Sequence, residues 1–419
     1  MTVNDSILSQ IREQLIPSES LEHVSNKFQL ELKNRLKNSE KSMIIGGWIP
    51  QKSTMRPSEK SPNTFLVIDF GGSTLKFALI SMPTCEIVLQ DGFIITDKFV
   101  DYKFFDTMIT RISLKLNEHL AGEVQRPKFL VSITFSFPLN DKLEIITMSK
   151  GFEISPDIMH KSVKEIIASS FSRVLSNIPV QKFDVEVCNV INDSIAVYLT
   201  SKFMCKDESI SLILGTGINS CFELCLEQVP PKKRPHNILD NCNCLINVEA
   251  GFLGDNTINI TNFDYHEDGE KNMPLENVSS GKWMPITFAN ILNQYQIAGF
   301  GSTSINGELL VEIAENKYKG GLDDENLKLV QEISKLLIQR GAFYMVAMLL
   351  AVASFVNEDI DRNQSRKAAE VGYVGSFLEH SNYYKSQLAL FSQDRIHFQF
   401  LHNSNLIGAA VATYLNKCN

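Results

Sequence analysis

The sequence lacks the features that mark several large classes of protein. Its eight cysteines show no paired Cys/His spacing of a zinc site, and Cys242 and Cys244 stand too close together to form half of one. Lys and Arg residues form no stripe interleaved with aromatic residues, and the net charge is −8. We therefore expect no structural zinc and no nucleic-acid partner.

Long hydrophobic runs and export signals are also missing. The longest apolar stretch, residues 341–355, is shorter than the ~18–20 residues that a membrane span needs, so it predicts a buried helix. The N-terminal residues show no charged-then-apolar signal pattern. Several cysteines lie in apolar, strand-like runs, where a free thiol packs as a small hydrophobe. Together these absences favour a reduced, cytoplasmic protein with no membrane span.

What the chain does contain predicts an α/β protein of two domains. Its 419 residues exceed one ordinary hydrophobic core, and 44% of them are apolar. A turn is expected at 45–50 and a polar connector at 51–63. Hydrophobic periodicity predicts strands at 65–70, 75–81, 85–98, 128–135, 185–190, 371–375 and 398–401, a β-meander over 209–248, and helices at 21–36, 104–120, 160–175, 193–203, 327–337, 342–356 and 406–415.

One sequence pattern occurs twice, about 140 residues apart. In residues 65–80 and again in 210–221, a buried-strand run ends in glycine and small hydroxyl residues, and apolar alternation then resumes. This pattern predicts a strand–turn–strand whose turn presents backbone N–H groups where side chains do not fit. Such a concavity binds phosphate oxygens. Two copies indicate a nucleotide held between two related halves.

Three charged residues near these segments are open to two interpretations each. Asp69 precedes the first glycine turn, where it either faces phosphate through Mg²⁺ or stabilises the turn through its own backbone. Lys76 either reaches a phosphate or is a solvated strand lysine. Asp193 opens a predicted helix, and this pattern alone favours a helix N-cap over a catalytic carboxylate.

Eight segments occur in an order that identifies a family. They are 47–48, 68–74, 134–138, 149–152, 191–194, 215–219, 246–251 and 273–281. Through these motifs the chain resembles the eukaryotic hexokinases and glucokinases, especially the fungal branch, over nearly all of its length. The resemblance implies a duplicated actin-like ATPase (ribonuclease H-like) α/β fold with two domains around a cleft. The small domain would comprise 62–191 plus 404–419, and the large domain 1–61 plus 192–403.

The resemblance also implies a function: transfer of the ATP γ-phosphoryl group to the 6-hydroxyl of a hexose, feeding glycolysis. Glucose is the expected substrate, with fructose or mannose also accepted, in a monomer or homodimer. Asp193 would be the general base, and Asp69 would hold Mg²⁺ through water. Sugar hydroxyls would be bound by Ser136, Ser149, Lys150, Asn192, Asn219, Glu249 and Glu276. ATP would be bound by Asp69, Gly71, Gly72, Ser73, Thr74, Lys76, Gly215, Thr216, Gly217, Gly375, Ser376 and Ser404.

Departures from the family pattern gather on the nucleotide side. The first turn reads Ser73-Thr74 where the family has Thr-Asn, and Lys76 replaces an arginine. Val374 replaces an aspartate before Gly375, and residues 403–408 keep only the last glycine and a small polar residue of a Gly-rich turn, with bulky Leu406 and Ile407 inside it. Two alternatives therefore stand beside the hexokinase hypothesis: a catalytically weak, sugar-binding regulatory protein, and an N-acetylglucosamine kinase.

Overall fold

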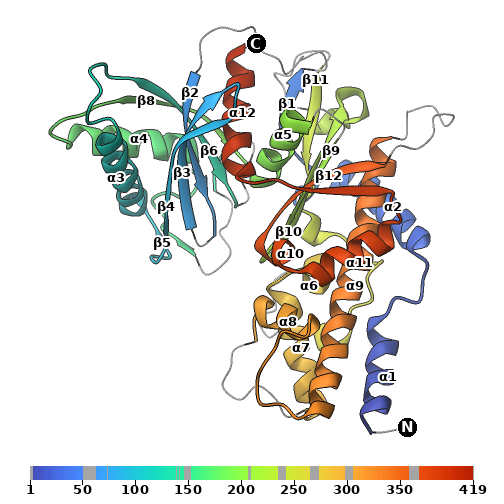
Figure 1. Cartoon of the computed structure of the whole chain (residues 1–419). Coiled ribbons are helices and arrows are strands. Elements are labelled where there is room, and N and C mark those ends of the chain that lie inside the picture. The colour runs from blue at the N-terminus through green and yellow to red at the C-terminus, as the bar shows by residue number, and fades with distance from the viewer. Residues whose placement is uncertain are drawn as a thin grey trace. The chain divides into compact units, whose positions relative to one another are not determined.

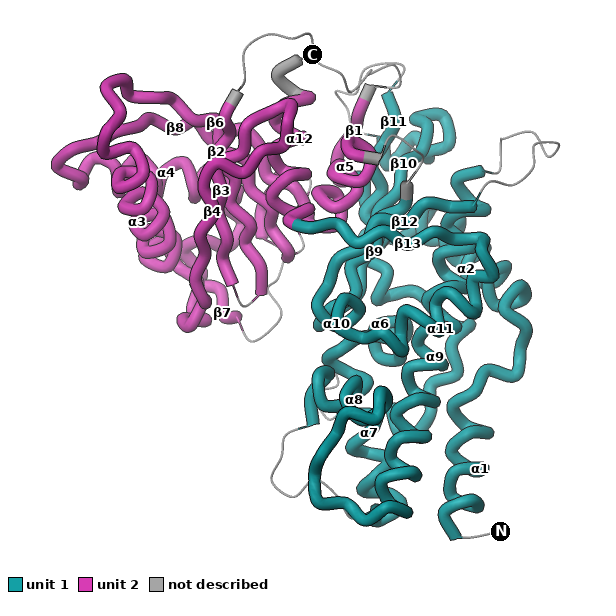
Figure 2. The backbone as a smooth tube through the Cα atoms, in the orientation of Figure 1, with its two compact units in different colours: residues 1–45, 207–402 teal, residues 46–206, 403–419 magenta. Residues whose placement is uncertain are grey.

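The chain folds into two compact units, which Figures 1 and 2 show. Unit 1 comprises residues 1–45 and 207–402, and unit 2 comprises residues 46–206 and 403–419. The computed structural model describes residues 3–50, 63–72, 74–137, 139–140, 142–145, 152–205, 209–234, 242–264, 273–297, 305–357 and 368–418.

Unit 2 is built on a five-stranded sheet with the order β4-β3-β2-β6-β8. The first three strands form an antiparallel meander, and β6 and β8 then run parallel to β2. The strands are β2 (Asn63–Phe70), β3 (Thr74–Met82), β4 (Glu86–Ile94), β6 (Lys128–Phe135) and β8 (Asp184–Ile191), with a separate short pair, β5 (Phe99–Val100) and β7 (Glu153–Ile154).

Helices cover both faces of this sheet. They are α3 (Tyr102–His119), α4 (Val163–Ser176), α5 (Asp193–Cys205) and α12 (Ser404–Cys418). Leu66, Ile68 and Phe70 alternate onto the face that shares a buried core with α3 and α4. Phe65 points to the other face, where its ring meets Tyr414 of α12 edge-on. Because successive strand residues face opposite sides, the apolar run of β2 fills two cores at once.

Unit 1 repeats the strand order of unit 2. Its six-stranded sheet has the order β1-β11-β10-β9-β12-β13, in which β9, β10 and β11 form an antiparallel meander and β12 and β13 run parallel to β9. Each sheet thus places its meander and its two parallel strands in the same succession. The strands are β1 (Ile44–Pro50), β9 (Ser209–Leu214), β10 (Ile218–Cys225), β11 (Cys242–Asn247), β12 (Ala369–Val374) and β13 (Ile396–Phe400). This repetition confirms the predicted duplication.

The helices of unit 1 include one that is much longer than the sequence predicted. They are α1 (Val3–Leu15), α2 (Leu21–Asn38), α6 (Pro274–Ser279), α7 (Trp283–Gln294), α8 (Gly307–Ala314), α9 (Asp324–Val356), α10 (Ser376–His380) and α11 (Asn382–Ser392), with short 3₁₀ turns η1 (Leu226–Gln228), η2 (Pro231–Lys233), η3 (Ala250–Phe252) and η4 (Asn262–Asp264). Two helices were expected where α9 is continuous. Gly341 lies inside it, where the missing side chain lets the Met284 side chain and the Val278 carbonyl approach closely.

Helix α9 crosses the core of unit 1 and carries a buried charge at its centre. Arg340 is 1% exposed and forms a two-point ion pair with Asp264, at 2.9 Å and 2.8 Å. By length and composition α9 passes the test for a membrane span, but 78% of its apolar window is buried within the structure. The predicted buried helix is therefore confirmed, and its apolar surface is used for internal packing.

Several local predictions were wrong or incomplete. Residues 45–50, expected as a turn because of Gly46 and Gly47, belong to strand β1. Strand pairing in the sheet outweighs the low strand propensity of Gly46 and Gly47. This pairing cannot be recognised from the local sequence pattern. Helices α1, α6, α7, α8, α10 and α11 were not predicted individually, and the expected strand 85–98 ends at Ile94.

The compact units and the predicted domains divide the chain differently. The predicted large domain includes residues 46–50 and 192–205, whereas the structure groups both segments with unit 2, although residues 46–50 belong to strand β1 of the six-stranded sheet. Helix α5 packs against α12 so closely that a Cβ atom on Gly408 would lie 1.8 Å from the Ala196 carbonyl oxygen. Helix α5 is therefore grouped with α12 in unit 2. The functional division into a small and a large domain stays a prediction.

Candidate sugar and phosphate site

In unit 2, the predicted metal-binding and catalytic carboxylates leave the same edge of the sheet. Asp69 on β2 pairs with Thr134 on β6, and Thr134 pairs with Ile191 on β8. These three residues form one row across parallel strands, which spans about 10 Å at the usual strand spacing. Asp193 follows two residues after this row. Both carboxylates are half-buried at the carboxyl ends of the strands, where α/β sheets commonly bind ligands.

The junction of β8 and α5 assigns the N-cap to Asn192. The Asn192 Oδ1 atom accepts hydrogen bonds from the Ser194 N–H at 2.9 Å and from the Ser194 hydroxyl at 2.7 Å. The Ala196 N–H donates to the Asn192 carbonyl, which starts the helix. Asp193 is the first helical residue, and its Oδ1 atom accepts from the Ser194 N–H at 2.8 Å. The capping role considered for Asp193 therefore belongs mainly to its neighbour.

The first glycine turn is a tight connection between β2 and β3. The Gly71 N–H donates to the Thr74 carbonyl at 3.1 Å, and the Gly72 carbonyl accepts from the Lys98 ammonium at 3.0 Å. Lys98 also lies 3.8 Å from the centre of the Phe152 ring. Lys76, opposite Asp69 on β3, is exposed. The turn thus has two cations close by, and only Lys76 was predicted from the sequence.

Ser136 continues the β6 strand toward this turn. Its N–H donates to the Phe70 carbonyl at 3.2 Å, and the residue is half-buried. The neighbouring predicted residues Ser73, Ser149 and Lys150 lie outside the described residues. The bond from Ser136 places it beside the last residue of β2, immediately before the first glycine turn.

The start of α12 contacts Asp69 directly. The Asn405 Nδ2 atom lies 3.2 Å and 3.3 Å from the two Asp69 carboxylate oxygens. Ser404, predicted to bind nucleotide, is 2% exposed, and its carbonyl accepts from the Thr200 hydroxyl at 2.7 Å. Leu406 and Ile407 are 1% and 7% exposed, so the core of unit 2 accommodates their bulk. The departures in this segment are therefore packed into the fold.

In unit 1, the second glycine turn lies beside a second nucleotide motif. The Gly215 N–H donates to the Gly217 carbonyl at 3.0 Å, and the Gly281 N–H donates to the Gly215 carbonyl at 2.9 Å. A Cβ atom on Gly215 would lie 3.7 Å from Gly375, whose φ of 120° only glycine adopts readily. Thr216 and Ser376 are both exposed. The structure thus brings together residues that are 160 positions apart in the chain.

Three polar side chains of unit 1 form a chain of hydrogen bonds. The Asn219 amide donates to the Asn247 Oδ1 atom at 2.9 Å, and the Asn247 amide donates to the Glu249 Oε1 atom at 2.8 Å. Asn247 and Asn219 are buried, whereas Glu249 is partly exposed. Glu249 has the left-handed backbone angles φ 50° and ψ 57°, which are costly for a residue with a side chain. This network orients the Glu249 carboxylate from the core outward.

Glu276 is held next to the second glycine turn. Its Oε2 atom accepts from the Ile218 N–H at 3.3 Å, and its Oε1 atom accepts from the Trp283 indole N–H at 3.2 Å. The carboxylate is partly exposed, and each oxygen has a second lone pair for a sugar hydroxyl. Lys282 lies 4.1 Å from the centre of the Trp283 ring. We therefore expect the fluorescence of Trp283 to respond to changes around the Glu276 carboxylate.

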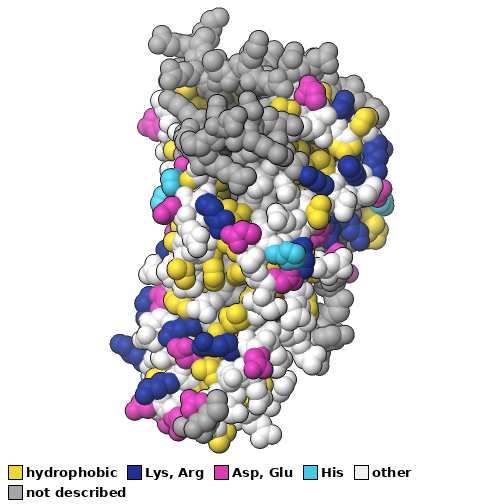
Figure 3. All heavy atoms as spheres, turned by 90° about the vertical axis from the view of Figure 1, so that its right-hand side faces the viewer, with side chains coloured by type: hydrophobic (Ala, Val, Ile, Leu, Met, Phe, Trp, Pro, Cys, Tyr) yellow, Lys and Arg dark blue, Asp and Glu magenta, His cyan; other side chains and the backbone are white. Residues whose placement is uncertain are grey.

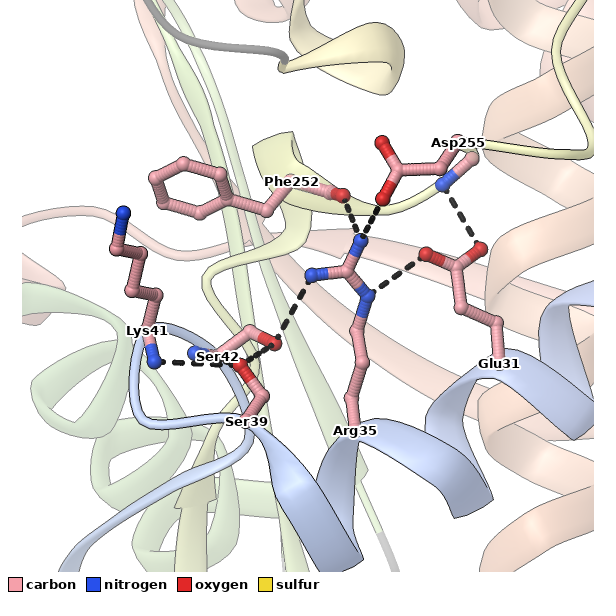
Figure 4. A network of polar contacts seen from close by, with 8 residues as sticks. Glu31, Arg35, Ser39, Lys41, Ser42, Phe252 and Asp255 are labelled. Atoms are coloured by element: carbon pink, nitrogen blue, oxygen red, sulfur yellow. Dashed lines mark hydrogen bonds and ion pairs between the residues drawn. The ribbon is translucent and has the colours of Figure 1, made fainter.

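Figure 4 shows how helix α2 holds the segment that follows Glu249. The Arg35 guanidinium donates to the Phe252 carbonyl at 2.5 Å and to the Asp255 carboxylate at 2.8 Å. Glu31 pairs with Arg35 at 2.7 Å and accepts from the Gly254 N–H at 2.9 Å. Burial raises the pKa of Glu31, although the Gly254 N–H and Arg35 both act to lower it. The network anchors the η3 turn, and with it the strained backbone at Glu249.

The donor set fits Mg²⁺ carried by a nucleotide. Among the described residues no group of three His, Cys, Asp or Glu side chains is placed to hold a metal ion. The first turn supplies one carboxylate, Asp69, beside backbone N–H groups. Mg²⁺ typically uses one or two carboxylates and completes its shell with waters and substrate phosphates. On the face that Figure 3 shows, the coloured Lys/Arg and Asp/Glu side chains are interspersed.

Three contacting residues were missed by the sequence reasoning. Asn247 lies between Asn219 and Glu249, Lys98 contacts the first glycine turn, and Asn405 contacts Asp69. Asn247 belongs to the quoted 246–251 motif, so its position was a usable signal. Lys98 and Asn405 lie 26 and 336 residues from their partners in the turn, and no local pattern indicates either contact.

Comparisons with known proteins identify the family of this chain. Two family models, both described as Hexokinase, match residues 7–203 and 302–415. N-acetylglucosamine kinase 1 of Candida albicans is 24% identical, covering 98% of this chain and 94% of that protein. Hexokinase-2 of Solanum tuberosum is 22% identical over 79% of this chain and 74% of its own length.

The fold is also that of a known structure. A hexokinase from Schistosoma mansoni complexed with glucose matches with a TM-score of 0.75 at 16% identity, covering 98% of this chain and 99% of that one. This likeness confirms the predicted duplicated actin-like ATPase fold. The two family models together match well over half of the chain. The protein belongs to the hexokinase family of sugar phosphotransferases, as a divergent member.

Proposed function

We propose that the protein transfers the γ-phosphoryl group of ATP to the 6-hydroxyl of a hexose, with glucose as the first candidate. The observation that carries this proposal is the row of residues at the sheet edge of unit 2. Asp69 lies at the β2 end of this row, directly before the first glycine turn, and Asp193 follows the β8 end of the same row. A carboxylate poised at a phosphate-binding edge is what proton abstraction from an attacking hydroxyl requires.

Each group has a stated task in this proposal. Asp193 accepts the proton of the 6-hydroxyl, which contributes ~10²–10⁴ in rate. Glu249 and Glu276 accept hydrogen bonds from the other hydroxyls and, with Asn219, set the orientation of the ring. Bound Mg·ATP supplies the phosphoryl group and neutralises its charge. The backbone N–H groups of the two glycine turns and Asp69 hold the nucleotide phosphates and the metal.

A second candidate sugar is N-acetylglucosamine. It is supported by the Candida albicans relative, whose alignment covers nearly the whole of both chains. The groups that bind hydroxyls serve several hexoses equally well, so the sugar has to be identified by competition. The same experiment tests the regulatory alternative, which predicts sugar binding without turnover.

The test is ATP-dependent phosphorylation by the full chain across glucose, fructose, mannose and N-acetylglucosamine. We expect a 6-phosphate product from at least one sugar, and no product from the matching 6-deoxy sugar, which should instead act as a competitive inhibitor. Sugar binding is followed by Trp283 fluorescence in a Trp48→Phe background, since the chain has two tryptophans. Binding without any turnover would support the regulatory alternative and overturn the proposal.

We further propose that the enzyme acts in the cytoplasm and that its product enters glycolysis if glucose is the substrate. The cysteine spacings support this location. Fluorescence microscopy of a tagged full chain tests it, and an organellar or extracellular signal would contradict it. Light scattering at several concentrations distinguishes between the two expected states, a monomer and a homodimer.

A further inference from the structure

The contact between α12 and the first glycine turn is built from residues outside the quoted family motifs. The Asn405 Nδ2 atom bridges both oxygens of the Asp69 carboxylate, at 3.2 Å and 3.3 Å. A donor shared by both oxygens restrains rotation of the carboxylate about its last bond. The amide orientation follows from the charge, because a flipped amide would present its oxygen to the carboxylate.

Asn405 is itself held in place by its backbone. The Thr134 hydroxyl donates to the Asn405 carbonyl at 3.0 Å, and Thr134 is the strand partner of Asp69. These three residues therefore form a ring of contacts. Asp69 is the strand partner of Thr134, Thr134 is hydrogen-bonded to Asn405, and Asn405 is hydrogen-bonded to Asp69. Thr134 is fully buried, and the preceding carbonyl of Ser404 is tied to the Thr200 hydroxyl at 2.7 Å.

This arrangement has a cost that packing alone does not explain. Among the described residues, the Asn405 Oδ1 atom is one of six buried side-chain oxygen or nitrogen atoms that have no hydrogen-bond partner. An unsatisfied buried acceptor usually destabilises a fold, so an apolar side chain of similar shape would serve stability better. The amide nitrogen is the part of Asn405 that makes a contact, and that contact is with Asp69.

We propose that Asn405 is a positioning residue for Asp69, which fixes the carboxylate in the orientation that binds nucleotide-bound Mg²⁺. This role takes the place of the Gly-rich turn that the chain lacks at 403–408. The proposal rests on the proposed nucleotide function of Asp69. It predicts that Asn405 affects binding of the metal–nucleotide complex and leaves binding of the sugar and of metal-free nucleotide unchanged.

The variants distinguish the effect of the Asn405 amide donor from the effect of the side-chain volume. Asn405→Ala removes both, Asn405→Leu keeps the volume without the donor, and Thr134→Val removes the hydroxyl that holds the Asn405 backbone. Asn403→Ala is the matched control, because Asn403 is exposed and its side chain meets Gln90 at 3.3 Å. Calorimetry measures the Kd of the full chain for the non-hydrolysable analogue AMP-PNP, with Mg²⁺ and with EDTA.

We expect the Kd for Mg·AMP-PNP to rise about tenfold or more in Asn405→Ala and Asn405→Leu, and by less in Thr134→Val. The Kd with EDTA, the sugar Kd and the Asn403→Ala values should stay at the wild-type level. In an Asp69→Asn background, Asn405→Ala should add no further loss. Wild-type binding by Asn405→Leu, or an equal loss with and without Mg²⁺, would overturn the positioning role.

Crystal structures of the variants make the inference independent of nucleotide binding. The Asp69 side chain should leave its wild-type rotamer in Asn405→Ala and keep it in Asn403→Ala. An unchanged rotamer in Asn405→Ala would overturn the inference, even if the wild type binds nucleotide. The expected rotamer change in Asn405→Ala, together with a wild type that binds no Mg·AMP-PNP, would instead refute the nucleotide function of Asp69.

Discussion

The two units share one strand order but hold their candidate site residues by different means. In unit 1, the buried amide of Asn247 donates a hydrogen bond to Glu249, and the Arg35 guanidinium holds the following segment through the Phe252 carbonyl. In unit 2, the candidate carboxylates are placed by strand register and by the packing of α12. A polar network suits recognition of many hydroxyls, because each donor and acceptor must be matched.

The comparison changes how the departures from the family pattern are interpreted. The sugar-side motifs of unit 1 are nearly complete, and their side chains contact one another. The altered segment 403–408 of unit 2 is also ordered: Leu406 and Ile407 fill the core, while Asn405 contacts Asp69. The contact between Asn405 and Asp69 thus lies in the segment that lacks the family glycines.

The largest expected effect is that of Asp193→Asn in unit 2. Turnover should fall by ~10²–10⁴, because the amide does not accept the proton of the attacking hydroxyl. Sugar binding, measured by Trp283 fluorescence, should change little, since the main sugar contacts are assigned to unit 1. A variant that turns over at the wild-type rate would contradict the assignment of Asp193 as the general base.

Next in size is the effect of Arg340→Ala on the stability of unit 1. The substitution leaves the buried Asp264 carboxylate without its ion-pair partner, and the free energy of unfolding should fall by about 3–5 kcal/mol. Urea unfolding measures the loss. The double variant Arg340→Ala/Asp264→Ala should recover part of it, and a single variant as stable as the wild type would show that the pair is not structural.

Asn247→Ala tests the polar network of unit 1. Without the bridging amide, Glu249 loses its hydrogen bond from the core, and the KM for the sugar should rise about tenfold. The KM for ATP should stay unchanged. Asn243→Ala on the same strand is the matched control, because Asn243 bonds to Glu223. Equal effects of the two variants would contradict a specific role for the network.

Gly408→Ala tests the packing that places α12 in unit 2. An added methyl group would meet the Ala196 carbonyl oxygen at 1.8 Å, so the two helices must move apart, at a cost of about 1–3 kcal/mol. Thermal unfolding measures the change. In the same unit, Gly122→Ala is the control, since a methyl group there meets nothing within 4 Å. A neutral Gly408→Ala would mean that the helix contact is loose.

The smallest expected effect is a pH dependence specific to unit 1. Burial acts to raise the pKa of Asp264, but Arg340 and the Thr261 hydrogen bonds outweigh it, so the pKa lies below its ordinary value of 3.8. The carboxylate therefore contributes stability above pH 3.8, and this contribution is lost as the pH falls through the folded-state pKa. Asp264→Asn should flatten the stability profile there. An unchanged profile would contradict the assignment.

Local patterns were enough to predict the elements around the candidate site. The hairpins at both glycine turns, the strand before Asn192 and the helix after it follow from apolar alternation and helix periodicity. The duplication followed from the strand–turn–strand pattern that occurs in both halves of the chain. The actin-like fold followed from the family resemblance that the order of the motifs carries. The strand at 44–50 and the continuous α9 were missed, because sheet pairing and close helix packing override the local preference of glycine.

The sequence by itself determined the family, the duplicated architecture and the residue types of the candidate site, since short motifs carry their own backbone geometry. Only the tertiary structure decided which side chains hold those residues. Asn247 turns Glu249 outward, Lys98 contacts the carbonyl of Gly72, and Asn405 crosses from α12 to Asp69. Such long-range contacts depend on strand register and helix packing, which are properties of the whole fold rather than of any local segment.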